Sequence, residues 1–388
     1  MSAPLAPGIP EIIAPELPLQ GWGGWFFTEV GRSLDGAVLQ AMRFVIDAAL
    51  MPRPEDLPAL RASAARFLAG ELRDEPRRFF AIVDEPAAPL EVTSRVRRRI
   101  EGGVVLSRRF ATAYRPSGDA IAPGNEDRIH VEHWVHDPDR TRATVVALHG
   151  FSMGYPWIDG FALFAAQLFR RGFDVALVTL PFHGKRSPAD ARFSGERFAV
   201  PDVARLNEAV RQAIYEIHVL VGWLRQETGA PVGLLGLSLG GYLSALMAGL
   251  TASLDFVIPM VPPVCMGDLA WRFFERSRHH RERPATAFSR EELRTAYGVH
   301  SPLTYPCRVE KRRLMILAGR GDQIVPPDHP HALWRHWGEP KIVWFNGSHL
   351  APFGRGRLLR AIVDHIGGTL PPYSPNRGGL PTSTPRAG

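Results

Sequence analysis

The chain has 388 residues, of which 45% are hydrophobic and 22% charged, as is usual for a globular protein with one large domain or two. Its formal net charge of +7 comes mostly from scattered arginines, and the basic clusters at 95–99 and 272–283 match no nucleic-acid-binding motif. Two cysteines exclude a disulfide framework, no apolar run approaches the roughly 20 residues of a membrane span, and the N-terminus lacks a signal-peptide pattern. We therefore expect no nucleic-acid partner, no integral membrane segment and a reducing, cytoplasmic location.

The N-terminal region, residues 1–90, predicts an arm followed by a helical extension. Residues 1–20 are rich in proline and lack helical periodicity, so we expect an extended or disordered arm. Apolar residues at helical spacing then predict helices over 34–50 and 58–72. We expect these helices to pack an apolar stripe on the main domain. The alternatives are a homo-oligomer contact through residues 21–73 or a membrane-surface contact.

From residue 91 the pattern changes to strands. Stretches at 92–100 and 104–114, joined by Glu101-Gly102-Gly103, predict a β-hairpin. A further alternating strand is expected at 129–135.

Three histidines in or beside that strand, His130, His133 and His136, suggest a metal site at first sight. On a strand, however, His133 faces the opposite side from the other two, and no carboxylate or thiolate accompanies them. We therefore predict no metal site here.

The remaining chain alternates strands with helices, the pattern of a doubly wound, mostly parallel sheet of the α/β class. Strands are predicted at 144–148, 173–180, 231–235, 256–261, 313–317 and 341–345. Helices are predicted at 158–171, from a cap at Asp202 to 228, and at 241–251, 330–338 and 356–366.

Two segments depart from this alternation. The interval 262–312 holds aromatic side chains at 271–274 beside the second basic cluster, so we expect a short lid-like insertion or pocket wall. Residues 368–388 are mostly glycine, proline, serine and threonine, and we expect a disordered tail. The main domain would then span 91–367.

The motif that carries chemistry is Gly236-Leu237-Ser238-Leu239-Gly240, which lies between a predicted strand and a predicted helix. A serine at the tip of such a sharp turn is a nucleophile elbow, and its flanking positions have no room for side chains. The helix that follows directs unpaired N–H groups at negative charge forming beside Ser238. The alternative is a tightly packed Gly-rich turn without chemistry.

Three other predicted strands also end in suggestive residues. His149-Gly150-Phe151 follows 144–148, Asp322 follows the strand at 313–317, and His349 follows the strand at 341–345. Parallel strands bring such ends to one edge of the sheet.

In this order of serine, acid and histidine, the sequence resembles the α/β-hydrolase fold family over roughly residues 141–367. The resemblance implies that Ser238 is the nucleophile, that His349 is its general base and that Asp322 orients the imidazole. It also implies an oxyanion hole formed by the N–H groups of Leu239 and Phe151.

Other residues are candidates for the substrate site or compete for the acid and base roles. We expect His149, Ser152 and His183 to line the substrate site, and we interpret His149 as a structural residue that orders the oxyanion loop rather than as a proton carrier. Asp255 and Asp268 compete with Asp322 for the acid role. His329, His331 and His336 compete with His349, but only His349 ends a strand at the family's short interval after Asp322.

The sequence thus predicts a serine hydrolase that cleaves carboxylic esters or thioesters of a small-molecule acyl substrate through an acyl-enzyme. Two alternatives stay open: a peptidase or amidase using the same triad, and a non-catalytic binding protein of the same fold. No cofactor is expected, because the glycines match neither a dinucleotide nor a phosphate-loop spacing. The insertion at 262–312 hints at a partly apolar pocket for an anionic substrate group.

Overall fold

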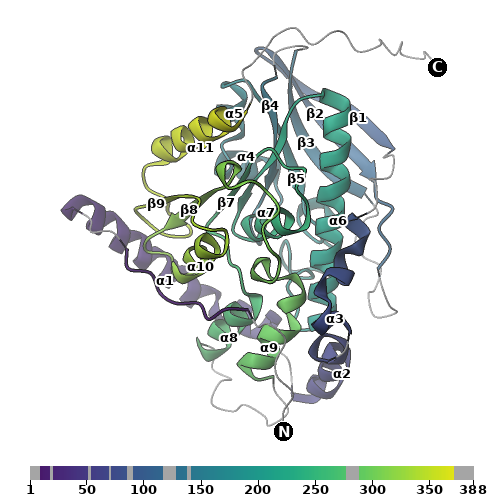
Figure 1. The fold of residues 1–388 in the computed structure, drawn as a ribbon, viewed down its shortest axis with the longest axis vertical. Helices are drawn as coiled ribbons and strands as arrows, with labels where there is room; N and C mark the ends of the chain where they lie inside the picture. Colours follow the sequence, from purple (N-terminus) through teal and green to yellow (C-terminus); the bar gives the residue numbers. More distant parts are fainter. Residues whose placement is uncertain are drawn as a thin grey trace.

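The structure is a computed structural model that describes residues 9–17, 21–50, 54–69, 71–84, 91–116, 128–137, 141–276 and 288–370. Within these ranges its centre is a nine-stranded sheet in the order β1-β2-β3-β5-β4-β6-β7-β8-β9 (Figure 1). The strands are β1 (Val92–Ile100), β2 (Gly103–Ala111), β3 (Arg128–His136), β4 (Ala143–Leu148), β5 (Phe173–Thr179), β6 (Val232–Leu237), β7 (Val257–Met260), β8 (Met315–Gly319) and β9 (Lys341–Phe345).

The sheet changes direction once along its width. β1, β2, β3 and β5 pair antiparallel, and the predicted hairpin of β1 and β2 is confirmed. From β5 through β4 and β6 to β9, neighbouring strands pair parallel. Because the chain moves from β4 outward to β5 and then returns to β6, strand order reverses between β4 and β6. Open α/β sheets bind ligands beyond the C-terminal ends of their strands at such a reversal.

Helices cover both faces of the sheet, so the doubly wound prediction is confirmed (Figure 1). One face carries α4 (Pro156–Ala162), α5 (Ala165–Phe169) and α11 (Arg355–Thr369). The other carries α6 (Val203–Thr228), α7 (Leu239–Leu250) and α10 (Asp328–His336).

Because side chains alternate in direction along the buried strands, the sheet has an apolar core on each face. In β4, Val145 and Ala147 pack toward α5 and α11, whereas Val146 and Leu148 pack toward α6 and α7. Successive side chains of a strand point to opposite faces, so an uninterrupted apolar strand fills both cores.

Two predicted helices show how local residues set helix ends. The carboxylate of Asp202 accepts hydrogen bonds from the N–H groups of Ala204 and Arg205, and α6 ends at Gly229 with φ 62°, as predicted. The predicted helix at 158–171 is instead divided into α4 and α5. Phe164 between them has φ 60°, which interrupts the helical backbone.

The N-terminal extension contains α1 (Trp22–Leu50), η1 (Pro54–Asp56), α2 (Leu57–Leu68), α3 (Glu71–Asp74) and η2 (Pro76–Val83). α1 therefore begins well before the predicted residue 34, and the predicted 58–72 helix is two short helices.

Of the positions in the expected apolar stripe of α1, only Val38 has a described side chain, and it is half-buried. The buried positions among residues 21–40 are Thr28, Gly31 and Asp35, at helical spacing, while Trp22, Trp25 and other aromatic residues are exposed. The predicted apolar positions at 42–49 lie outside the described side chains.

The two departures from the alternating pattern are partly described. The insertion contains α8 (Met266–Arg276), α9 (Arg290–Ala296), η5 (Gly298–His300), η6 (Pro302–Thr304) and η7 (Lys311–Arg313), and its residues 277–287 lie outside the described ranges. In the predicted tail, α11 extends through Thr369, so residues 368 and 369 are helical rather than disordered. Residues 371–388 lie outside the description.

The predicted N-terminal arm is described over residues 9–17, which form no regular secondary structure. Arg294 on α9 donates to the carbonyl oxygens of Ile9 (2.6 Å) and Pro10 (3.1 Å). This part of the arm is therefore extended and held against α9.

Candidate active site

Ser238 occupies the turn between β6 and α7 with φ 52° and ψ −110°. This backbone conformation is rare for a residue with a side chain and stores strain at the turn. A Cβ at Gly236 would overlap the carbonyl oxygen of Gly240, and one at Gly240 would overlap that of Leu148. Strand, serine and helix therefore pack so closely that glycine is required on both sides of Ser238.

The structure brings the three residues predicted to act together into one hydrogen-bonded chain. His349 Nε2 lies 2.9 Å from Ser238 Oγ, and His349 Nδ1 lies 2.7 Å from Asp322 Oδ2. Asp322 is 1% exposed, and its other carboxylate oxygen accepts from the N–H groups of Ile324 (2.9 Å) and Val325 (2.7 Å). Hydrogen bonds from its own loop thus hold the Asp322 carboxylate in the position from which it orients the imidazole of His349.

The electrostatics of His349 favour proton uptake. Burial acts to lower its pKa, but the carboxylate of Asp322, its hydrogen bond to the ring and the carboxylate of Asp35 together raise the pKa above its ordinary value of 6.5. A base stabilised in its protonated form is suited to accept the hydroxyl proton of Ser238.

The loop after β4 lies beside the serine. A Cβ at Gly150 would lie 3.5 Å from Ser238 Cβ, and Ser152 at the loop's exposed tip has φ 63°. Within the part of the chain that the structure describes, the N–H groups of Phe151 and Leu239 donate to no protein acceptor. Both amides therefore remain available for a ligand oxygen, as the oxyanion prediction requires.

Two of the three residues expected to line the substrate site are buried instead. His149 is 0% exposed; its Nδ1 lies 2.8 Å from the carbonyl oxygen of Gly150, and its Nε2 accepts from the Leu180 N–H at 3.1 Å. Burial lowers its pKa to about 4, so the ring is neutral and orders the loop.

His183 is likewise 0% exposed, with Nδ1 2.8 Å from the carbonyl oxygen of Pro181. Burial holds its pKa well below the ordinary range. Its ring packs edge-on against His149 and Phe151, so it supports the loop from beneath rather than lining an entrance. Of the three predicted residues, only Ser152 is exposed.

The competing acids and histidines are engaged elsewhere. His329 is buried, its Nδ1 accepts from the Val264 N–H, and burial lowers its pKa to about 4. His336 binds the carbonyl oxygen of Tyr305, and His331 stacks on Trp334. The rival acids each pair with two arginines: Asp255 with Arg225 and Arg313, and Asp268 with Arg290 and Arg294.

Asp35 is a site residue that the sequence prediction missed. It lies on α1, is 0% exposed, and accepts hydrogen bonds from the loops that carry Asp322 and His349. The available signal was that Asp35, like Arg43 and Asp47, interrupts a mostly apolar stretch at 34–51. Its partners lie about 290 to 315 positions away, so the sequence alone could not identify them.

The lid-like insertion contacts the acid loop. Arg276 at the end of α8 donates to the carbonyl oxygen of Gln323 (3.2 Å), and Arg272 pairs with Asp328 (3.1 Å). This contact fits a pocket wall beside Asp322, and the lid function remains a prediction.

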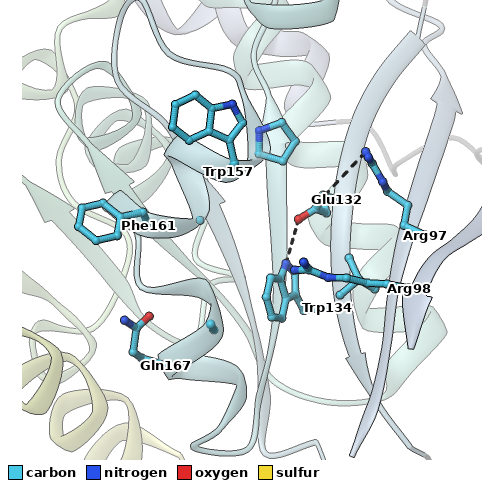
Figure 2. Close-up of a pocket in the computed structure, with 11 residues that line it drawn as sticks. Arg97, Arg98, Glu132, Trp134, Trp157, Phe161 and Gln167 are labelled. Atoms are coloured by element: carbon cyan, nitrogen blue, oxygen red, sulfur yellow. Dashed lines mark hydrogen bonds and ion pairs between the residues drawn. The ribbon is translucent and has the colours of Figure 1, made fainter. Parts of the chain in front are cut away.

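A cavity of about 520 Å³ opens elsewhere, between β1–β3 and α4–α5 (Figure 2). Glu132 lies between Arg97 (4.0 Å) and the indole nitrogen of Trp134 (3.2 Å), and the guanidinium of Arg98 lies over the Trp134 ring. Trp157 and Phe161 complete its aromatic rim. None of the triad residues lines this cavity, so it is separate from the site around Ser238.

Within the described ranges, no three His, Cys, Asp or Glu side chains gather as metal ligands. His136 instead binds the carboxylate of Asp174 at 2.7 Å, and His133 is buried. No helix among the described residues is long and apolar enough to cross a bilayer.

Comparison with known proteins adds the following. Residues 86–267 match the model of the family described as "Alpha/beta hydrolase domain containing 18". Over 229 residues the chain is 34% identical to uncharacterised proteins of two Mycobacterium tuberculosis strains, CDC 1551 / Oshkosh and ATCC 25618 / H37Rv. The match covers 57% of this chain, and it spans about half (53%) of the length of these curated relatives.

Among solved structures, acetyl xylan esterase 1 from Thermoanaerobacterium sp. JW/SL YS485 superposes with a TM-score of 0.56 at 17% identity, covering 82% of this chain and 99% of that one. An acetyl xylan esterase from Paenibacillus sp. R4 superposes with a TM-score of 0.55 at 12% identity, covering 77% and 98%. At such identities the likeness concerns the fold alone.

Proposed function

Because this chain belongs to the α/β-hydrolase fold superfamily, we propose that it is a serine hydrolase that cleaves carboxylic esters or thioesters. The observation that carries the proposal is the hydrogen-bonded chain from Ser238 through His349 to Asp322. A fold alone does not fix an activity, but this constellation on a strained turn performs one kind of chemistry in many unrelated proteins.

In the first half-reaction, His349 Nε2 takes the proton of Ser238 Oγ as the oxygen attacks the acyl carbon. The carbonyl π electrons move onto the oxygen, which the N–H groups of Leu239 and Phe151 stabilise. Asp322 holds the imidazolium through Nδ1. When the tetrahedral intermediate collapses, the bond to the leaving group breaks, and His349 returns the proton to the departing alcohol or thiol.

In the second half-reaction, water replaces the leaving group. His349 removes a proton from water, the hydroxide oxygen attacks the acyl-enzyme, and the same two amides hold the oxyanion. Collapse of this tetrahedral intermediate breaks the bond between the acyl carbon and Ser238 Oγ, and Ser238 Oγ regains its proton from His349. The sum is one ester or thioester and one water converted to a carboxylic acid and an alcohol or thiol.

A fluorophosphonate probe tests the nucleophile directly. Such a probe phosphonylates an activated serine, so wild-type protein should be labelled on the peptide that contains Ser238. Ser238→Ala should lose both labelling and ester cleavage. Ser244 lies farther along α7, and folded Ser244→Ala should retain labelling. Labelling that persists in Ser238→Ala would overturn the assignment.

A substrate panel separates the alternatives. Esters and thioesters of increasing acyl length should be cleaved faster than the matching amides. Turnover of aminoacyl amides without ester cleavage would select the peptidase or amidase function. Absence of turnover and of labelling in folded protein would select a non-catalytic binding role.

An anionic substrate group is a further part of the proposal. Its support is the arginine-bearing helix α8, whose Arg276 contacts the carbonyl of Gln323 next to Asp322. The anionic succinyl monoester of an alcohol should have a lower KM than the neutral acetyl ester of the same alcohol. Arg276→Gln should remove that difference. Equal KM values for the two esters in the wild-type protein would eliminate this part of the proposal.

Self-association through residues 21–73 stays a prediction. It is supported by the exposed aromatic side chains of α1, with Trp22 89% and Phe26 57% exposed. Sedimentation velocity should give a concentration-dependent mass, and the double substitution Trp22→Ser with Phe26→Ser should reduce it.

The unpaired thiols of Cys265 and Cys307 support the reducing, cytoplasmic location proposed from sequence.

A further inference from the structure

Asp35 accepts hydrogen bonds from four groups of the two loops that carry the acid and the base. The acid loop contributes the Gln323 N–H at 3.0 Å. The histidine loop contributes the Ser348 hydroxyl at 2.8 Å and the N–H groups of His349 at 3.0 Å and Leu350 at 3.1 Å. One side chain from the N-terminal helix therefore ties both loops together, and one of its bonds goes to the backbone of His349 itself.

The helix that carries Asp35 is in close backbone contact with the same loops. A Cβ at Gly31, one turn before Asp35, would lie 2.8 Å from Gly347 Cα and from Ser348 N. A Cβ at Gly321 would lie 2.6 Å from the carbonyl oxygen of Thr28. In Figure 1, α1 accordingly passes on the side of the sheet where β8 and β9 lie. The buried face of α1 is thus shaped to fit the catalytic loops.

A carboxylate is the group that these partners require. Three backbone N–H donors and one hydroxyl converge on two oxygens, and an ionised acceptor makes stronger hydrogen bonds to them than a neutral one. Within the described residues Asp35 forms no ion pair with a basic side chain, so its charge is stabilised by these donors rather than by a cation.

The negative charge also acts on the catalytic ring. Among the described residues, two charged groups influence His349: Asp322 from the loop after β8 and Asp35 from α1, while the elbow contributes the neutral Ser238. Both carboxylates favour the imidazolium that forms when Ser238 loses its proton.

Given the proposed serine-hydrolase function, on which it rests, we propose that Asp35 is a positioning residue that sets the geometry and basicity of His349. The N-terminal helix α1 is then a part of the active site rather than an appendage to the domain.

The decisive variant is Asp35→Asn, which keeps the shape of the side chain, removes its charge and replaces one of its two acceptor oxygens with an NH2 donor. We expect kcat to fall by about 10²-fold with little change in KM, because a small misplacement of the base weakens the chemical step more than binding. The acid limb of kcat/KM should also move to lower pH, since the imidazolium loses one stabilising charge. Glu29→Gln is the matched control on the outer side of α1, where Glu29 pairs with Arg32 at 3.5 Å, and should change neither quantity.

The outcomes separate this proposal from the proposed function. If Ser238→Ala is inactive but Asp35→Asn keeps the wild-type rate and pH profile, the role of Asp35 is overturned and the hydrolase function stands. If Ser238→Ala keeps wild-type turnover, the function itself fails and the role of Asp35 fails with it. Should Asp35→Asn not fold by circular dichroism, Ser348→Ala is measured in its place; it removes one of the four donors to Asp35, together with the 3.4 Å acceptor of the Ala351 N–H. It should lower kcat without raising KM, and an unchanged kcat would overturn the proposal.

Discussion

At the residue scale, His349 is held at three points. Its two ring nitrogens connect Ser238 to Asp322, and its backbone N–H is held by Asp35. Only the neutral imidazole can accept the serine proton, and the neighbouring carboxylates raise the His349 pKa above 6.5 against the effect of burial. Ester cleavage should therefore fall as the pH drops through a midpoint above 6.5. A stopped-flow profile of kcat/KM against pH measures that midpoint, and a value below 6.5 would contradict the proposed electrostatics.

Asp159 gives a second pH prediction that concerns stability. This carboxyl is 3% exposed, accepts from the Gly154 N–H in the loop after β4, and has a pKa raised to about 7, mainly by burial and to a smaller extent by Glu132. Its pKa in the folded protein thus exceeds the unfolded value near 3.8, so the wild type loses stability as the pH rises from 4 to above 7.

Asp159→Asn removes that loss. Relative to wild type, its free energy of unfolding should increase between pH 5 and pH 8 by up to about 3 kcal/mol, because about two of the roughly three pKa units that separate the folded and unfolded states fall within this range. Urea titrations at the two pH values measure the change. An equal difference between the two proteins at both pH values would exclude a raised Asp159 pKa.

The positions of the proposed triad could be predicted from the sequence because each residue lies at or within a few positions of the end of a strand, and parallel strands end at one edge of a sheet. Asp35 could not, since its partners are joined to it only by the tertiary packing of α1. The burial of His183 could not be predicted for a related reason, whereas the role of His149 in ordering the oxyanion loop was anticipated. A histidine in a site loop can face substrate or the underlying core, and the local sequence does not distinguish the two.

At the scale of elements, the elbow depends on close packing of β6 against α7 and β4. Gly240→Ala would place a methyl group against the carbonyl of Leu148, so we expect a loss of at least about 2 kcal/mol in the free energy of unfolding. Gly356→Ala is the matched control, because a Cβ there in helix α11 meets nothing within 4 Å. That control should stabilise the protein by up to about 1 kcal/mol. Comparable changes in both variants would refute the packing explanation.

Element boundaries were predictable where capping residues mark them. Asp202 and Gly229 define α6, and Glu101-Gly102-Gly103 defines the turn between β1 and β2. The early start of α1 was missed because its first turns carry exposed aromatic residues and glycines, which give no amphipathic pattern. The split between α4 and α5 depends on the backbone of Phe164, which no residue preference predicts.

At the scale of the whole molecule, a buried ion pair joins the loop after β5 to the long helix α6. Arg186, 1% exposed, makes two hydrogen bonds to Glu216 at 2.6 and 2.8 Å and a third to the carbonyl of Thr179. Arg186→Met would leave Glu216 buried without a cation, with only the Gln212 amide still donating to it among the described residues, and should cost about 3–5 kcal/mol of stability.

The exposed pair of Arg312 and Glu310 provides the control for that prediction, because both side chains are more than half exposed. Arg312→Met should change the free energy of unfolding by less than about 1 kcal/mol. Guanidinium chloride titrations compare the two variants. If the buried and the exposed substitution cost the same, the pair of Arg186 and Glu216 does not stabilise the fold as proposed.

The central claim is that Ser238 carries the acyl group during turnover. Rapid acid quench of wild-type protein with an activated acetyl ester, followed by peptide mass spectrometry, measures it directly. The account predicts an acetyl group on the peptide that contains Ser238 within the first turnover, and no such adduct and no ester cleavage in Ser238→Ala. An acyl group on any other residue that forms and decays at the rate of turnover, or ester cleavage that survives in Ser238→Ala, would contradict it.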